Sequence, residues 1–228
     1  MSLKGMSTNV CRPCATSSMT RVAVFAGGDK SHYRTDFDLF VGVDGGARWL
    51  LEQDLPLDFA VGDFDSVSPT EFEQIEAQAS KLVRAQPEKD DTDLELALLT
   101  VFADHPQAQV TIFGAFGGRI DHTLANVFLP SNDKLAPFLQ QIQLEDGQNL
   151  LYYRGQGTSF VEPIAGYDYL AFMPVQDCAL TIRGAKYDLD ESNFFFKKVY
   201  ASNEFIGREV QVTCPAGYVV VMYSRDWR

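Results

Sequence analysis

Short apolar runs that end in glycine or aspartate place the strongest constraint on how this chain folds. The clearest runs are residues 22–26, 39–43 and 110–113, and each is followed by at least one glycine within two positions. Continuous apolar runs bounded by glycine are typical of strands that are buried on both faces, as in a parallel sheet. Residues 82–83 show the same pattern more weakly.

Helix start signals lie between these runs. Ser68-Pro69-Thr70-Glu71 combines an N-cap serine, a proline at the first helical position and a glutamate at the third, which predicts a helix to about residue 80. Thr92-Asp93-Leu94-Glu95 repeats the capping box ahead of an apolar stripe. Strands and helices therefore alternate, which predicts an α/β domain over residues 21–139 with a mainly parallel, Rossmann-like sheet and helices on both sides.

The pattern changes after about residue 135. Short strand candidates follow one another between Gly, Asp, Asn and Pro turns, and no convincing helix intervenes; they are residues 142–144, 150–153, 159–161, 169–172, 179–182, 210–213 and 218–223. This predicts a smaller all-β sandwich domain over residues 140–228. Residues 1–20 lack hydrophobic periodicity and are interpreted as a tag and disordered leader.

Charge and composition exclude several classes of protein. The chain has 31 acidic and 19 basic residues and a net charge of −12, so its surface would repel nucleic acid. No apolar run approaches the roughly 20 residues that cross a bilayer, and none resembles a signal peptide. We therefore expect a cytoplasmic protein that binds neither nucleic acid nor membrane. The Cys11-x-x-Cys14 pair has no second pair at zinc-ligand spacing and is interpreted as incidental.

The placement of aspartates is the strongest functional signal. Six of them follow a strand candidate or open a helix: Asp44, Asp63, Asp65, Asp90, Asp93 and Asp121. In an open α/β sheet these positions gather at the carboxyl ends of the strands, where ligands bind. Two carboxylates about 5 Å apart repel each other by roughly 3 kcal/mol at an effective dielectric near 20, unless a cation relieves the repulsion. Oxygen ligands favour Mg²⁺, so the pattern predicts a magnesium-nucleotide site.

The individual motifs differ in specificity. In an extended segment, Asp63 and Asp65 would point the same way while Phe64 faces the core, which favours a metal site. Asp44-Gly45-Gly46 is equally typical of a simple turn. The run Lys89-Asp90-Asp91-Thr92-Asp93 also suits a charged helix N-terminus without any ligand.

A glycine-rich loop follows the strand candidate at residues 110–113. It matches neither the P-loop pattern nor the dinucleotide-binding fingerprint. Gly117 and Gly118 would still let backbone N–H groups approach phosphate, and Arg119 adds a bidentate donor. His122 is as consistent with a structural hydrogen bond as with a catalytic base.

Four segments together resemble the thiamine pyrophosphokinase family, and the resemblance extends over residues 21–226. The segments are Asp44-Gly45-Gly46-Ala47, Gly62-Asp63-Phe64-Asp65-Ser66, Lys89-Asp90-x-Thr92-Asp93 and Gly117-Gly118-Arg119-x-Asp121-His122. Residues 183–187 and 201–204 are similar to the C-terminal motifs of the family.

The resemblance implies an enzyme that uses Mg²⁺ and moves the terminal diphosphate of ATP onto the hydroxyl of thiamine. It implies an α/β catalytic domain, a β-sandwich domain and a homodimer with sites between the subunits. Magnesium would bind Asp63, Asp65 and Asp93, with Asp44, Asp90 and Asp121 in or near the same polar site. The remaining residues implied to contact the two substrates are Gly45, Gly117, Gly118, Arg119 and His122 for the nucleotide, and Ser202 and Asn203 for thiamine.

Several alternatives stay open at the level of the sequence. The thiamine hydroxyl would attack the β-phosphorus and AMP would leave, with Asp90 or Asp121 as proton acceptor. The aromatic residue that stacks on thiamine is Tyr187, Tyr223 or Trp227. A metal-dependent nucleotide phosphohydrolase and a non-catalytic nucleotide or thiamine sensor remain alternative functions.

Overall fold

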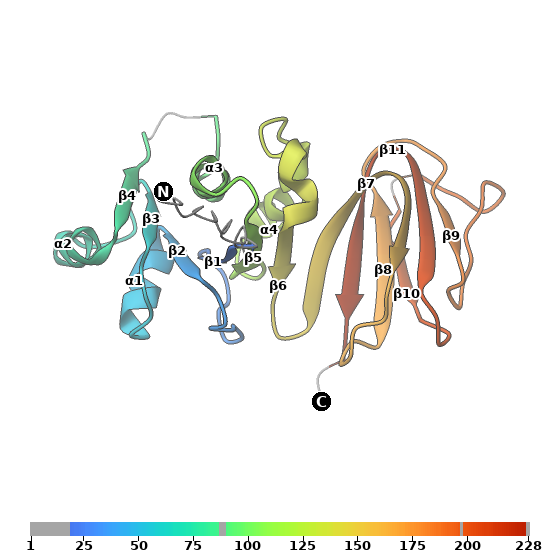
Figure 1. Ribbon diagram of the computed structural model, residues 1–228, viewed down its shortest axis with the longest axis horizontal. Coiled ribbons are helices and arrows are strands. Elements are labelled where there is room, and N and C mark those ends of the chain that lie inside the picture. Colours follow the sequence, from blue (N-terminus) through green and yellow to red (C-terminus); the bar gives the residue numbers. More distant parts are fainter. Residues whose placement is uncertain (1–18, 87–89, 197, 227–228) are drawn as a thin grey trace, which may run out of the picture.

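One mixed sheet runs through most of the protein (Figure 1). The computed structural model describes residues 19–86, 90–196 and 198–226, so the predicted leader lies outside the described residues except for positions 19 and 20. The strands are β1 (Arg21–Phe25), β2 (Leu39–Val43), β3 (Phe59–Gly62), β4 (Lys81–Arg84), β5 (Gln109–Phe113), β6 (Ile142–Glu145), β7 (Asn149–Val161), β8 (Tyr169–Pro174), β9 (Thr181–Arg183), β10 (Tyr200–Asn203) and β11 (Val210–Ser224). The helices are α1 (Gly45–Glu52), α2 (Pro69–Gln78), α3 (Asp93–Asp104) and α4 (Ile120–Val127), with 3₁₀ turns at Leu129–Ser131 and Ala136–Gln141.

The N-terminal half is the predicted parallel sheet with helices on both faces. Its strand order is β6-β5-β1-β2-β3-β4, and all five pairings are parallel. Val22 and Val24 of β1 face a core shared with α3, while Ala23 and Phe25 face a second core shared with α1 and α2. This alternation explains the continuous apolar runs, because both faces of each strand are covered.

Both predicted capping boxes are present. The Ser68 hydroxyl accepts a hydrogen bond from the Glu71 backbone N–H at 3.3 Å, and the Glu71 carboxylate accepts one from the Ser68 N–H at 2.7 Å. Thr92 and Glu95 make the same two bonds at 3.2 and 2.7 Å. The second box fixes the start of α3 at Asp93, and it thereby sets where that carboxylate lies.

The C-terminal half is β-rich, but its strands are longer than the sequence pattern suggests. The prediction of separate strands at 150–153 and 159–161, and at 210–213 and 218–223, is wrong, because each pair is one strand. The two interruptions lie opposite one another: Cys214 pairs with Gly157 and Tyr218 with Gly155, so three residues of β11 oppose one of β7. The glycines and Pro215 that were interpreted as turns therefore form a bulge within one long antiparallel ladder.

The long strands β7 and β11 connect two cores. Beyond the bulge, Tyr218 and Val220 of β11 face the core of the α/β half, while Val219 and Val221 face the core of the C-terminal half. Before the bulge, β11 pairs with β9, and after it with β8. One hairpin thus contributes to both halves of the molecule.

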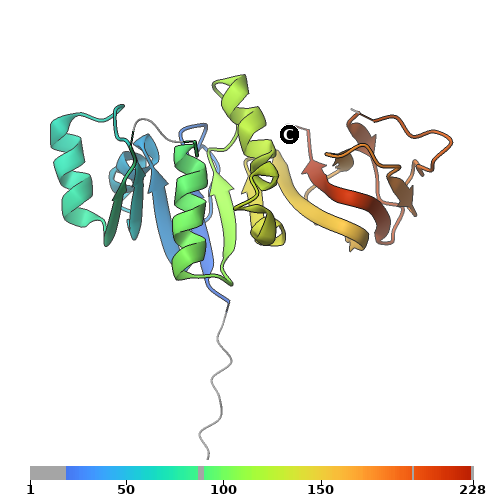
Figure 2. The same cartoon turned by 90° about the horizontal axis from the view of Figure 1, so that it is seen from above.

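The sheet is continuous across the predicted domain boundary at 139/140 (Figure 2). Strand β6, which the sequence pattern grouped with the β-sandwich, pairs in parallel with β5 and antiparallel with β7. It therefore joins the two kinds of sheet, and the boundary itself stays a prediction. Among the described residues, no helix combines the length and apolar character needed to span a membrane.

The two capping boxes allow a direct stability test. We expect Thr92→Ala and Ser68→Ala each to lower the free energy of unfolding by about 1 kcal/mol, because each removes one N-cap hydrogen bond from an exposed helix start. Urea denaturation monitored by circular dichroism measures both changes. An unchanged midpoint for either variant would show that its helix start does not depend on the cap.

Candidate active site

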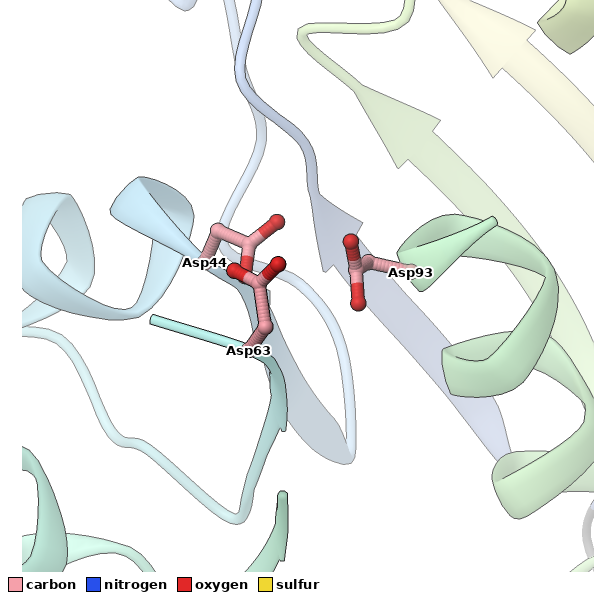
Figure 3. Close-up of side chains that lie close together, drawn as sticks. All are labelled: Asp44, Asp63 and Asp93. Carbon is pink, nitrogen blue, oxygen red and sulfur yellow. The ribbon is translucent and has the colours of Figure 1, made fainter. Parts of the chain in front are cut away.

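Three aspartates converge at the carboxyl edge of the parallel sheet (Figure 3). Asp44 follows β2, Asp63 follows β3, and Asp93 opens α3, which packs on both strands. One carboxylate oxygen from each lies within 4.8 Å of the others, and all three side chains are partly buried. The sequence-based expectation that aspartates from separate segments share one edge is met for these three.

The backbone beside the cluster is closely packed at Gly62 and strained at Asp44 and Phe64. A Cβ on Gly62 would lie 1.8 Å from the Asp44 Oδ1 atom, so only glycine allows this approach. Asp44 and Phe64 are two of the four non-glycine residues with positive φ in the described chain, at 47° and 59°. Such conformations cost about 1–3 kcal/mol each and persist where the surrounding structure imposes them. The Phe64 N–H donates to Asp44 Oδ1 at 3.3 Å, which ties the two strained residues together.

The electrostatic effect of the cluster is clearest in the pKa of the Asp44 carboxyl. Burial, followed by the negative charges of Asp93 and Asp63, raises the pKa of the Asp44 carboxyl to about 7, while the hydrogen bond from Phe64 opposes the rise. Two charges 4.8 Å apart repel each other by about 3 kcal/mol at an effective dielectric of about 20. The cluster therefore favours either a proton or a cation, and three carboxylate oxygens form a ligand set that suits Mg²⁺.

The prediction that Asp63 and Asp65 project together from an extended segment is wrong. The positive φ of Phe64 breaks the alternation, buries the Phe64 ring to 5% exposure and leaves Asp65 exposed. The third carboxylate of the cluster is that of Asp44 and not that of Asp65. The sequence pattern at Asp44 was equally consistent with a simple turn. The Asp63 carboxylate accepts a hydrogen bond from the Asp65 N–H at 3.1 Å, so the loop orients Asp63.

The carboxyl ends of β1 and β5 form a second part of this edge. The chain places β2, β3 and β4 on one side of β1 and β5 on the other, so the order of the strands reverses between β1 and β5. Ligands of open α/β sheets bind at such a switch point. Here Gly28 N–H donates to the Gly114 carbonyl at 2.8 Å and Asp29 N–H to the Phe116 carbonyl at 3.2 Å, which holds the two loops side by side.

Lys30 is a residue that the sequence analysis missed. Its ammonium donates to the carbonyls of Ala26 and Gly28 at 2.9 and 2.8 Å, and burial lowers its pKa. It also lies 5.9 Å from the centre of the Trp49 ring. The signal that could have found it is a lysine in the loop that follows the apolar run 22–26, two positions after Gly27-Gly28.

Other predicted residues of the α/β half do not enter the aspartate cluster. Arg119 and Asp121 form an ion pair with each other, and both are largely exposed. That pairing lowers the pKa of Asp121 to about 2. Asp90 and His122 are exposed, and Gly117 and Gly118 adopt positive φ in the loop after β5. Gly45 is the first residue of α1, and Lys89 lies outside the described residues.

Two family models match this arrangement of strands, loops and aspartates. The catalytic domain of thiamin pyrophosphokinase matches residues 31–134, and the vitamin B1 binding domain of the same enzyme matches residues 159–219. The chain belongs to the thiamin pyrophosphokinase family. The resemblance noted in the four motifs is thereby confirmed.

Relatives of known structure cover almost the whole chain. Thiamine pyrophosphokinase of Bacillus subtilis (strain 168) is 32% identical over 217 residues, which cover 91% of this chain and 100% of the relative. The crystal structure of a thiamin pyrophosphokinase family protein from Enterococcus faecalis is 42% identical, with a TM-score of 0.83 over 91% of this chain and 100% of that one. Yeast thiamin pyrophosphokinase, at 14% identity, shares the fold with a TM-score of 0.69 over 91% of this chain and 86% of that one.

The half that matches the vitamin B1 binding domain contains a hollow of about 510 Å³. It is lined by aromatic and polar residues that include Tyr187, Phe195, Tyr200 and Asn203. Asn203 is 3% exposed, and its amide bonds the backbone of Tyr187 through both the oxygen and the nitrogen. Ser202 is exposed with a φ of 58°. Asn203 therefore holds Tyr187 at the hollow.

The structure separates the three aromatic candidates for stacking on thiamine. Tyr223 is 1% exposed, and its hydroxyl donates to the Glu162 carbonyl at 2.7 Å, so its ring cannot contact a ligand without repacking the core. Tyr187 is 59% exposed, and Phe195, which the sequence analysis did not consider, is 66% exposed. Trp227 lies outside the described residues.

The raised pKa of Asp44 predicts a pH-dependent destabilisation of the metal-free protein. A carboxyl whose pKa rises from 3.8 to about 7 on folding destabilises the folded state fully above about pH 7, and this penalty disappears as the pH falls to about 4. We expect Asp44→Asn to be more stable than the parent above pH 7 in EDTA, with the difference shrinking toward pH 4. Urea denaturation across this range checks it; parallel curves for the two proteins would contradict the assigned origin of the shift.

Proposed function

We propose that this chain is a thiamine diphosphokinase, which transfers the terminal diphosphate of ATP to the hydroxyl of thiamine and releases AMP. The observation that carries the proposal is the cluster of Asp44, Asp63 and Asp93 at the same sheet edge as the switch-point loops, in a member of the thiamin pyrophosphokinase family. The Rossmann-like parallel half would act as the catalytic domain.

Magnesium fits the cluster because all three donors are carboxylate oxygens and their mutual repulsion needs a cation. Asp44, Asp63 and Asp93 would hold it, and the bound ion would neutralise charge on the phosphates of ATP. Asp65 was assigned by family resemblance, and it would join this set only if the loop after Phe64 rearranged.

Lys30 and the loops around it would receive the phosphates. The ammonium of Lys30 lies between the ends of β1 and β5, where its hydrogen bonds to Ala26 and Gly28 fix its position. Gly117, Gly118 and Arg119 follow β5 in the neighbouring loop. A fixed cation and backbone N–H groups at this point would orient the diphosphate and stabilise charge as it transfers.

The proton of the thiamine hydroxyl needs an acceptor, and Asp121 is poorly suited. Its ion pair with Arg119 lowers its pKa to about 2, which makes it a weak base. Asp90 is exposed beside α3 and remains the candidate from the sequence.

A homodimer would complete the site. The hollow beside Tyr187 and Asn203 lies at the β9–β10 end of the molecule, whereas the aspartates lie among α1, β3 and α3 (Figures 1 and 3). Within one chain, thiamine in the hollow could not reach a phosphate at the aspartates. A second copy that places its hollow over the aspartates of the first would bring the two substrates together.

The metal role of Asp93 has a matched control in the same helix. We expect Asp93→Asn to reduce kcat by at least about 100-fold, because it removes a ligand carboxylate. Asp104→Asn at the last position of α3 should retain near-normal kcat, because Asp104 pairs with the surface residue Lys81 at the far end of the helix. Formation of AMP and thiamine diphosphate is measured with ATP, Mg²⁺ and thiamine.

The same assay separates the proposal from nucleotide hydrolysis. AMP should appear only when thiamine is present. Formation of AMP or phosphate at an equal rate without thiamine would instead identify a phosphohydrolase.

Lys30 is expected to strengthen the binding of ATP. Lys30→Gln should raise the KM for ATP about tenfold or more with a smaller change in the KM for thiamine, because a charge-assisted contact to phosphate is lost. Lys81→Gln, at the amino end of β4, is the control. Equal KM values for ATP in the parent and Lys30→Gln would remove Lys30 from the phosphate site.

A further inference from the structure

A row of polar side chains crosses the middle of the sheet where apolar residues would be expected. Thr111 of β5 pairs in register with Gln143 of β6, which pairs with Tyr152 of β7. The Gln143 amide donates to the Thr111 hydroxyl at 2.9 Å, and Thr111 is 4% exposed. Their sequence neighbours, such as Ile112 and Leu144, belong to the apolar core on the opposite face. Polar residues thus alternate with core residues on central strands of an α/β sheet.

No described helix is seen to cover this row. Helix α1, which shares a core with Phe113, makes its main strand contacts with β1 and β2. A cavity of about 330 Å³ lies there instead, lined by Thr111, Gln143 and Tyr152 and by residues of the β1–β2 connection. This volume is at the lower end of the roughly 300–1,000 Å³ that is usual for small-molecule sites.

The cavity is basic in a strongly acidic protein. Arg21, Arg34 and Arg154 line it, and its described lining contains no Asp or Glu, although the chain carries a net charge of −12. Two carboxylates outside the lining pair with two of these arginines: Asp36 with Arg21 at 2.9 Å and Glu145 with Arg34 at 3.0 Å. Asp36 also pairs with Arg34 at 3.1 Å, and Asp38 accepts a hydrogen bond from the Arg21 backbone N–H at 2.8 Å, and these carboxylates near Arg21 and Arg34 lie outside the lining.

Arg154 is the third arginine of the lining. Among the described residues it makes no ion pair, and it is partly buried on β7. Its guanidinium lies 4.3 Å from the centre of the Tyr152 ring and donates through Nη1 to the Tyr153 carbonyl at 3.1 Å. The side chain is therefore fixed over the polar row, with further N–H donors left for a ligand.

The cavity lies away from the aspartate cluster. Arg21 and Gln109, which line it, are the first residues of β1 and β5, whereas the aspartates follow the last residues of β2 and β3 or open α3. A ligand bound here would thus occupy the opposite edge of the parallel strands from the proposed magnesium site.

We propose that this cavity is a second ligand site, which binds a small organic phosphate monoester with Arg154 as its principal anion contact. A guanidinium recognises a phosphate dianion through paired charge-assisted hydrogen bonds, and Arg21 at the rim adds a second cation. The amide oxygen of Gln143 and the ring of Phe37 offer polar and aromatic contacts for the organic part, whereas the Tyr152 hydroxyl is already bonded to the Tyr223 hydroxyl at 3.1 Å. The volume exceeds what a bare phosphate ion fills, which favours the monoester.

Calorimetric titration of the metal-free protein in EDTA tests the proposal, with AMP, inorganic phosphate and adenosine as probes. We expect saturable binding of AMP at one site per chain outside the aspartate cluster, weaker binding of inorganic phosphate and none of adenosine.

Arg154→Gln should weaken AMP binding by about tenfold or more. Arg208→Gln, at an exposed position outside the cavity, should leave it unchanged. Arg21→Gln, at the exposed rim, provides a second variant with an expected several-fold loss if Arg154→Gln does not fold.

Two further measurements distinguish binding in this cavity from binding at the aspartates and from a subunit interface. AMP binding that persists in both Asp93→Asn and Lys30→Gln but weakens in Arg154→Gln supports the cavity, whereas AMP binding retained in Arg154→Gln but lost in either of the other two variants places the ligand at the proposed active site and overturns the proposal. Absence of saturable AMP binding to the parent protein also overturns it. A fall in oligomeric mass of Arg154→Gln by light scattering, with AMP affinity unchanged, would identify the face as a subunit interface instead.

Discussion

Repulsion among three carboxylates at one edge of the sheet is the constraint on which the proposed function of this protein depends. Asp44, Asp63 and Asp93 come from three separate segments, and the buried strands and α3 hold them within 4.8 Å of one another. A flexible chain would separate such charges, so the arrangement requires the rigid core beneath it. The strained backbone at Asp44 and Phe64 and the absence of a side chain at Gly62 are local costs of that arrangement.

The apolar cores offset these costs. Helix α3 buries Leu98 and Val101 completely, and its capping box fixes the position at which Asp93 leaves the helix. The strands β2 and β3 are almost fully buried, so the residues that follow them start from well-defined positions. Packing therefore supplies the stability that offsets the repulsion. It also fixes the geometry in which the three carboxylates would hold a cation.

The two halves of the molecule share one sheet, and each contains one of the two proposed substrate sites. Strands β7 and β11 contribute alternate residues to two cores, which connects the β-rich half to the parallel half through shared packing. The acidic edge suits a cation and the phosphates it binds, and the hollow near Tyr187 suits an aromatic ligand. The basic cavity at the amino edge lies outside both, and its polar row on β5 to β7 interrupts a surface that would otherwise need a covering helix.

Local patterns in the sequence were sufficient for much of this architecture. The apolar runs predicted the parallel strands, and the two capping boxes predicted the starts of α2 and α3, because these signals depend on neighbouring residues only. The motifs also indicated the family and predicted that six aspartates would gather at one edge, of which Asp44, Asp63 and Asp93 do. The β7–β11 bulge could not be predicted, because Gly155 and Pro215 look like turn residues until the strands pair. The positive φ of Phe64, after which Asp65 is exposed, accompanies packing of the Phe64 ring in the core, and this packing involves residues distant in the sequence.

The sequence by itself thus determined most element types and the family, since these follow from periodicity, capping and specific motifs, and the chemistry of its carboxylates supports the proposal of a magnesium site. Tertiary structure alone decided which aspartates meet, that Tyr223 is buried while Tyr187 is exposed, and that Lys30 lies at the switch point between β1 and β5. It also decided that Thr111, Gln143 and Tyr152 form one row, because strand order and register exist only after distant segments pair.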